Sequence, residues 1–225
     1  MVQRWARAWF GATAVAGATA VVTEFVLSAS YTGYRQFSTP FARSTNELFF
    51  FTILSNLLVV AASVALAVRP RATVRVLRLS ALTGIVITAV VYHVVLAPIA
   101  HPHGLYVFTN LLLHTVVPIM AIGGWLAFGP RDRTPWRVVA LSLLFPLVYL
   151  AVTLIRGPLV HYYPYFFLDV DHLGYARMAR NATAVALLYL AVAAAITGTE
   201  RALSRRACGD PLVSCAGNSA TKPGE

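Results

Sequence analysis

The sequence predicts an all-α membrane protein, a polytopic bundle of six transmembrane helices, and three observations support this. Of the 225 residues, 58% are hydrophobic and only 12% are charged, which is about half the charged share of an ordinary soluble domain. The apolar residues come in runs of about 20, the length that a helix needs to cross a bilayer. Arginines gather between these runs rather than within them. With a mean hydropathy of +0.69, the chain has too little polar surface for a water-soluble fold.

The apolar runs define the six spans. They are predicted to be helical because lipid offers no hydrogen-bond partner to a free backbone N–H or C=O group. Pro118 and Pro146 fall inside spans, where neighbouring helices can accommodate a kink. The spans cover residues 8–28, 48–68, 79–97, 107–128, 137–155 and 178–198, within a single domain of residues 1–204. Residues 205–225 lack an apolar pattern and are predicted to be a disordered cytoplasmic tail.

The arginines and lysines predict the orientation. If the N-terminus is cytoplasmic, the outer side carries only Arg35, Arg43, Arg156, Arg177 and Arg180 of the 18 Lys and Arg residues. The other thirteen, Arg78 among them, then lie on the cytoplasmic side, as the positive-inside rule requires. The sequence therefore predicts a multi-pass protein of the cell membrane with both ends inside. The rival interpretation of the first span is a cleaved signal peptide with its cleavage site near Ser28. Its apolar stretch is long for a signal peptide, however, and Glu24 interrupts the approach to the cleavage site.

A net charge of +10 could indicate a protein that binds nucleic acid. The arginines do not form a stripe along one helix but sit in short clusters beside apolar runs, where they meet anionic lipid headgroups. No nucleic-acid partner is therefore expected. The two cysteines, Cys208 and Cys215, both fall in the predicted tail and have no metal-site spacing.

Polar side chains inside the spans are costly and therefore point to function. With the predicted orientation, four of them lie at a similar depth, on the order of 6–11 Å below the outer boundary at ~1.5 Å per residue. They come from four different helices and are Thr52, His93, His114 and Tyr149. A shared depth predicts an internal cavity that is reached from the outer side.

Threonine and histidine in such a layer have the chemistry of a nucleophile and its base. A threonine hydroxyl attacks a carbonyl only when a neighbouring base takes its proton, and histidine is the usual base. The predicted catalytic pair is Thr52 with His114. Asn56, Asn110, Tyr149 and His93 are candidates for binding the substrate or its oxyanion. Apolar walls suit a lipid ester that enters from the outer leaflet, so membrane lipids are the expected partners.

Other interpretations of the same residues stay open. Thr52 would ordinarily bond a carbonyl of its own helix, and His114 alone could be structural. A non-catalytic lipid-binding or carrier protein is the main alternative, although no acidic residue lies in mid-membrane and no inverted repeat is present. His93 and His114 could also be axial ligands of a haem or ligands of a metal. We nevertheless expect no cofactor or metal, because the sequence contains no compact ligand motif.

Three segments resemble a known family. They are FFFTILSN at residues 49–56, NLLLHTVVP at 110–118 and YYPYFFLD at 162–169. In this order and spacing the chain resembles, over roughly residues 45–190, the androgen-induced and androgen-dependent TFPI-regulating membrane proteins and their bacterial relatives. The resemblance implies a multi-pass threonine hydrolase of fatty acid esters of hydroxy fatty acids, with Thr52 as nucleophile and His114 as base. Asp169, in the third segment, is expected to order the aromatic loop or to fix a histidine.

Overall fold

The computed structural model describes residues 1–33, 36–69, 74–130 and 134–209. Within these residues all regular structure is helical. Six stretches are long and apolar enough to cross a bilayer, in agreement with the predicted number of spans. Their bounds are Val2–Ser30, Phe51–Val68, Arg75–Leu96, Leu105–Phe128, Trp136–Val160 and Val170–Arg205.

The first three stretches contain α1 (Val2–Ser30), α3 (Phe51–Val68) and α4 (Arg75–Val91) with the π-helical turn η2 (Tyr92–Leu96). The fourth contains α5 (Leu105–Leu111), the π-helical turn η3 (Leu112–Val116) and α6 (Val117–Phe128). The fifth contains α7 (Trp136–Ser142) and α8 (Leu144–Val160), and the sixth is α9 (Val170–Gly209). The short elements α2 (Pro40–Asn46), η1 (Glu47–Phe49) and η4 (Phe166–Leu168) lie between spans.

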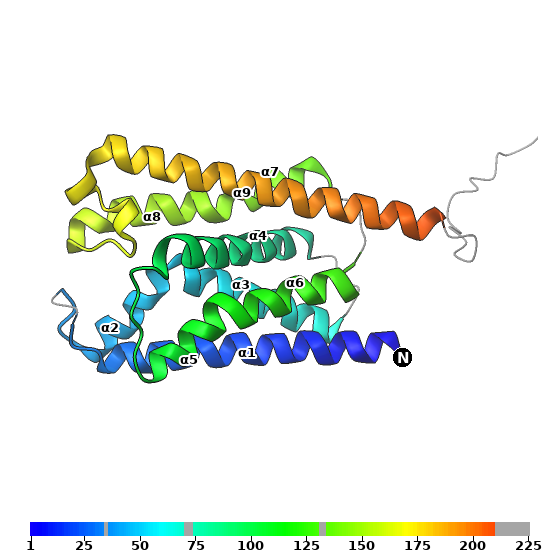
Figure 1. Cartoon of the computed structure of the whole chain (residues 1–225), viewed down its shortest axis with the longest axis horizontal. Coiled ribbons are helices and arrows are strands. Elements are labelled where there is room, and N and C mark those ends of the chain that lie inside the picture. Colours follow the sequence, from blue (N-terminus) through cyan, green and yellow to red (C-terminus); the bar gives the residue numbers. More distant parts are fainter. Residues whose placement is uncertain (34–35, 70–73, 131–133, 210–225) are drawn as a thin grey trace, which may run out of the picture.

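The helices run along one axis and alternate in direction (Figure 1). The N-terminus and the last turns of α9 lie at one end of the bundle, called here the terminal end. The opposite end, called the loop end, carries α2 and the connections α4–α5 and α8–α9 (Figure 1). The main core joins α3, α4 and α6 through buried residues such as Val59, Ile85 and Val117. An even number of spans places both ends of the described chain on one side.

Pro118 and Pro146, two of the prolines inside spans, break the helices locally, and the freed carbonyls are bonded from other helices. Pro118 has no N–H for the carbonyl of Leu113, five residues earlier in the π-helical register. The side-chain amide of Asn56 donates to that carbonyl at 3.3 Å. Pro146 likewise leaves the carbonyl of Ser142 without its helical donor, and the Tyr189 hydroxyl donates to it at 2.9 Å.

The α8–α9 connection is anchored at its end by Asp169. Its Oδ1 accepts the backbone N–H of His172 at 3.1 Å, and its Oδ2 lies 2.7 Å from Nδ1 of the same histidine. Asp169 therefore caps the first turn of α9 and also fixes a histidine. The side-chain amide of Asn181, further along α9, donates to the carbonyl of Phe167 at 3.0 Å. Both contacts hold the aromatic segment 162–169 against the bundle.

The C-terminal boundary differs from the predicted one. The tail was predicted to begin at residue 205, whereas α9 continues to Gly209. Residues 210–225, which include Cys215 and the rest of the predicted tail, lie outside the described residues.

Candidate active site

Thr52 is the second residue of α3 and is buried, with 8% of its surface exposed. Phe50 precedes the helix in an extended conformation, so the N–H of Thr52 is one of the first-turn donors that have no partner within the helix. It donates to the phenol oxygen of Tyr165 at 3.2 Å. The helix start therefore presents both the backbone N–H and the hydroxyl of Thr52 to other segments.

His114 lies in the π-helical turn η3, opposite Thr52. Its Nδ1 lies 3.1 Å from the backbone carbonyl oxygen of Asn110. Because a carbonyl only accepts, Nδ1 carries the hydrogen and Nε2 of the neutral ring has a free lone pair. Nε2 lies 3.3 Å from the hydroxyl oxygen of Thr52. The geometry makes Thr52 the donor and His114 the acceptor, which is the direction that proton removal requires.

Tyr165 completes the surroundings of the threonine hydroxyl. Its phenol oxygen lies 3.2 Å from Oγ1 of Thr52, and since the Thr52 proton points to His114, the Tyr165 hydroxyl donates to Oγ1. Burial raises the pKa of Tyr165 to about 12, so the phenol keeps its proton at neutral pH. Its ring stacks on Phe167 with centroids 5.2 Å apart.

Asn110 and Tyr92 support the histidine from behind. The ring of Tyr92 stacks on that of His114, with centroids 4.0 Å apart and an interplanar angle of 24°. The Asn110 side chain donates to the Tyr92 hydroxyl at 2.7 Å. Asn110 therefore orients the base through its backbone carbonyl and through Tyr92, and its amide group does not contact Thr52.

Asn56 is fully buried and joins the two helices that carry the pair. Its amide nitrogen donates to the carbonyl of Thr52 at 2.8 Å and to that of Leu113 at 3.3 Å. The bond to Leu113 fixes α3 against η3. Because the amide hydrogens are used on the backbone, Asn56 is placed to position the pair rather than to meet a substrate oxygen.

His93 lies apart from the pair. Its Nε2 lies 3.2 Å from the hydroxyl of Thr115 near the protein surface. The ring of Tyr92 contacts both imidazoles, at 5.1 Å from His93 and 4.0 Å from His114. No group of three or more His, Cys, Asp or Glu residues within metal-binding reach occurs in the described part of the chain.

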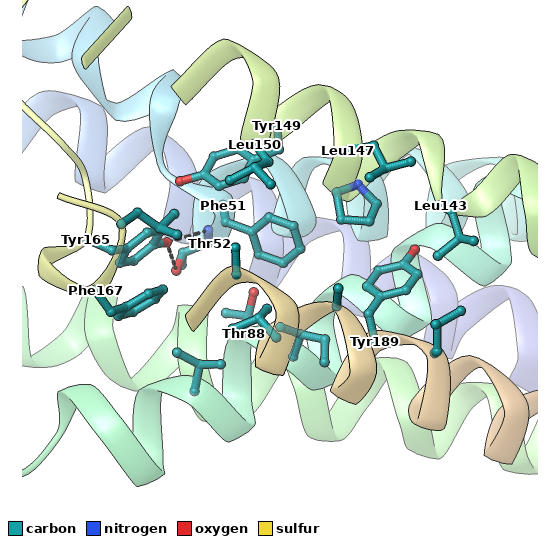
Figure 2. A pocket seen from close by; sticks show the side chains of 18 of the residues that line it. Phe51, Thr52, Thr88, Leu143, Leu147, Tyr149, Leu150, Tyr165, Phe167 and Tyr189 are labelled. Carbon is teal, nitrogen blue, oxygen red and sulfur yellow. Dashed lines mark hydrogen bonds between the residues drawn. The ribbon is translucent and has the colours of Figure 1, made fainter. Parts of the chain in front are cut away.

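A cavity of about 250 Å³ adjoins Thr52 between α3, α4, α8 and α9. Its walls are almost entirely apolar, and Thr52, Tyr149 and Tyr165 bring hydroxyls to it at the loop end (Figure 2). The Tyr149 hydroxyl oxygen is buried and has no hydrogen-bond partner among the described residues. Of the predicted site residues, the structure thus brings Thr52 and His114 into contact and places Tyr149 on the cavity that Thr52 lines, with Asn56 and Asn110 bonded around the pair.

Tyr165 is the site residue that the sequence does not predict. Segment 162–169 is aromatic, but neither helical periodicity nor depth singles out one tyrosine in a loop. The one signal in the sequence is that Tyr165 stands in the last of the three segments, 49–56, 110–118 and 162–169, on which the expected resemblance rests.

Six helices of this length and hydropathy fit an integral membrane protein. No protein-family model, curated protein or solved structure matches the chain.

Proposed function

We propose that the protein is a lipid-ester hydrolase that uses Thr52 as nucleophile and His114 as general base. The observation that carries the proposal is the 3.3 Å contact from the Thr52 hydroxyl to the unprotonated Nε2 of His114, beside an apolar cavity. A hydroxyl, an oriented neutral imidazole and an adjoining apolar cavity are the components of acyl transfer to or from a lipid ester.

The reaction has two steps. Oγ1 of Thr52 attacks the ester carbonyl carbon while Nε2 of His114 takes the hydroxyl proton. The carbon–oxygen bond to the alcohol breaks, and the alcohol leaves with that proton. Water then attacks the acyl-threonine with His114 again as base, the fatty acid is released, and the proton returns to Oγ1 of Thr52.

Two tyrosines are placed to stabilise the oxyanion of each tetrahedral intermediate. Tyr165 already donates to Oγ1 of Thr52, next to which the oxyanion forms. Tyr149 has a buried hydroxyl without a partner and lines the same cavity. Preformed donors in a site that excludes water are worth about 10²–10³ in kcat each. The first turn of α3 adds its positive dipole end.

The substrate class follows from the cavity. Apolar walls favour a fatty-acyl chain, and the position of Thr52 near the loop end suits an ester close to the headgroup region of one leaflet. Together with the three motifs described above, this supports membership of the androgen-induced and androgen-dependent TFPI-regulating protein family. A fatty acid ester of a hydroxy fatty acid is then the expected substrate.

The proposed location is the cell membrane, with the terminal end in the cytoplasm and the loop end outside. The excess of arginine at the terminal end supports this orientation. A single cysteine at His103→Cys, in a chain whose own cysteines are replaced by serine, should react with an impermeant thiol reagent added outside intact cells. Labelling from the cytoplasmic side alone would show that the orientation is the opposite of the proposed one.

The activity is tested by turnover of fatty-acyl esters with the full chain in detergent micelles. Thr52→Ala and His114→Ala should each lower kcat by at least about 10³-fold, whereas Ser55→Ala should retain it. Ser55 is a matched control because its hydroxyl is one turn away on α3 and bonds the Phe51 carbonyl and Thr88. Equal turnover in all four proteins, or binding of lipid without turnover, would reject the hydrolase and favour a lipid-binding or carrier protein.

A further inference from the structure

The cavity beside Thr52 is elongated along the helices. Thr52, Tyr165 and Phe167 lie at one end, and Leu143 and Tyr189 lie at the other (Figure 2). Along α9 its wall extends from Ala182 to Leu190, which corresponds to about 12 Å at ~1.5 Å per residue. Such a shape fits a single extended hydrocarbon chain that starts at Thr52.

The far end is closed by Tyr189, which is only 1% exposed. Its hydroxyl donates to the Ser142 carbonyl at 2.9 Å, the carbonyl that Pro146 leaves free. Both ends of the tyrosine side chain are therefore fixed, one by α9 and the other by the α7–α8 break. The ring forms a rigid stop at the end of the cavity.

One long side of the cavity is open. Leu147 on α8 and Leu190 on α9 line it, yet they are 58% and 43% exposed. Between them α9 presents small residues, Ala182 and Ala186. For helices that cross a bilayer, this surface faces hydrocarbon, so the cavity opens to the membrane interior between α8 and α9.

We propose that this cavity is an acyl-chain site that a lipid chain enters sideways between α8 and α9, and that Tyr189 sets the longest chain it accepts. The position of the reacting ester at Thr52 rests on the proposed function. Binding of the chain does not, because it depends on the apolar walls alone.

The site is tested first without catalysis. The Thr52→Ala chain in lipid nanodiscs is irradiated with a fatty acid that carries a diazirine at its methyl end, and the cross-linked peptides are sequenced. Adducts are expected near Leu143 and Tyr189. Adducts only in the separate apolar groove lined by Leu48, Phe49 and Val148, or no adducts on α8 and α9, would overturn the proposal.

Competition by unlabelled fatty acids of increasing length then tests whether Tyr189 limits the length of the bound chain. Affinity should rise with each added methylene group that packs against the walls until the chain reaches Tyr189, and should then level off. Tyr189→Ala should move this plateau to longer chains. Ala186→Phe should move it to shorter ones, and it keeps the proposal testable if the tyrosine variant misfolds.

Leu187→Phe is the matched control for Ala186→Phe. Leu187 is the next residue on α9 and is 62% exposed, away from the cavity, so its variant should keep the native plateau. An identical plateau in all variants would overturn the role of Tyr189. Chain binding with the predicted plateau but no ester turnover in the native protein would reject the hydrolase while leaving the acyl-chain site in place.

Discussion

The phenol oxygen of Tyr165 lies 3.2 Å from the backbone nitrogen of Thr52 and 3.2 Å from its hydroxyl oxygen, although the two residues are 113 positions apart. One tyrosine thus links the α8–α9 connection to the first turn of α3. It fixes the threonine hydroxyl between a hydrogen-bond donor and the imidazole of His114. Order in this loop is therefore expected to control the geometry of the pair.

Tyr165→Phe removes one hydroxyl from this arrangement. Loss of a donor next to the developing oxyanion should lower kcat by about 10²-fold with little change in KM. Tyr163→Phe is the control, because Tyr163 lies in the same loop, is equally buried at 8% exposure and has a hydroxyl without a hydrogen-bond partner among the described residues. The kcat values of the two variants, measured by steady-state kinetics, should differ. Equal kcat values would show that the Tyr165 hydroxyl does not take part in the reaction.

The ionisation of Tyr165 should be displaced to high pH. Burial raises its pKa from 10.0 to about 12. Because the folded pKa is raised, the stability that the neutral phenol contributes is complete below pH 10 and is lost as the pH approaches 12. The difference in phenolate absorbance between the native protein and Tyr165→Phe should therefore appear only near pH 12. A step near pH 10 in folded protein would contradict the buried position.

Pro118→Ala tests the π-helical turn that carries His114. The alanine supplies an N–H that can bond the carbonyl of His114, four residues earlier, in the α-helical register. The turn should tighten and move the imidazole of His114 away from Thr52. A displacement of about 1 Å costs on the order of 10²-fold in rate, while the unfolding temperature should be kept or raised because a helical hydrogen bond is gained. Unchanged turnover would show that the turn does not position the base.

A buried ion pair near the terminal end should contribute to stability and not to turnover. Arg78 and Glu200 are 4% and 2% exposed, and their side chains meet at 3.1 Å. Trp125 and Thr134 also donate to the carboxylate, at 3.2 and 2.6 Å. Glu200→Ala leaves a buried guanidinium unpaired and should destabilise the fold by about 3–5 kcal/mol.

Replacement of both charges by apolar residues, Arg78→Met with Glu200→Leu, should recover most of the lost stability. Thermal unfolding in detergent measures both effects. If the double variant were less stable than Glu200→Ala, the simple ion-pair account would be contradicted.

The spans could be predicted from the sequence because hydrocarbon imposes a length and a composition on each helix. Their number agrees with the structure, and the ends differ mainly where helices extend past the apolar stretch, as α9 does at both ends. Arg78 shows the limit of this reasoning. It was counted as a charge at the membrane surface, whereas it is buried against Glu200, and a count of charges carries no information on pairing between distant helices.

The proximity of Thr52 and His114 could be predicted because depth along a helix follows from the rise per residue. The direction in which a side chain points does not follow as readily when the helix contains a π-helical turn. His93 and His114 both lie in such turns, and His93 meets Thr115 rather than Thr52. Tyr165 could not be predicted, because the path of an irregular loop depends on contacts such as Asn181 with Phe167 that have no periodic signature.

Covalent capture of the nucleophile is the most direct test of the account. The full chain is treated with a fluorophosphonate probe, and the modified residue is identified by peptide mass spectrometry. The adduct should be on the hydroxyl of Thr52, should be lost in His114→Ala and should persist in Ser55→Ala. An adduct on any other residue, or folded protein that takes up no probe, would contradict the assignment of Thr52 as a nucleophile activated by His114.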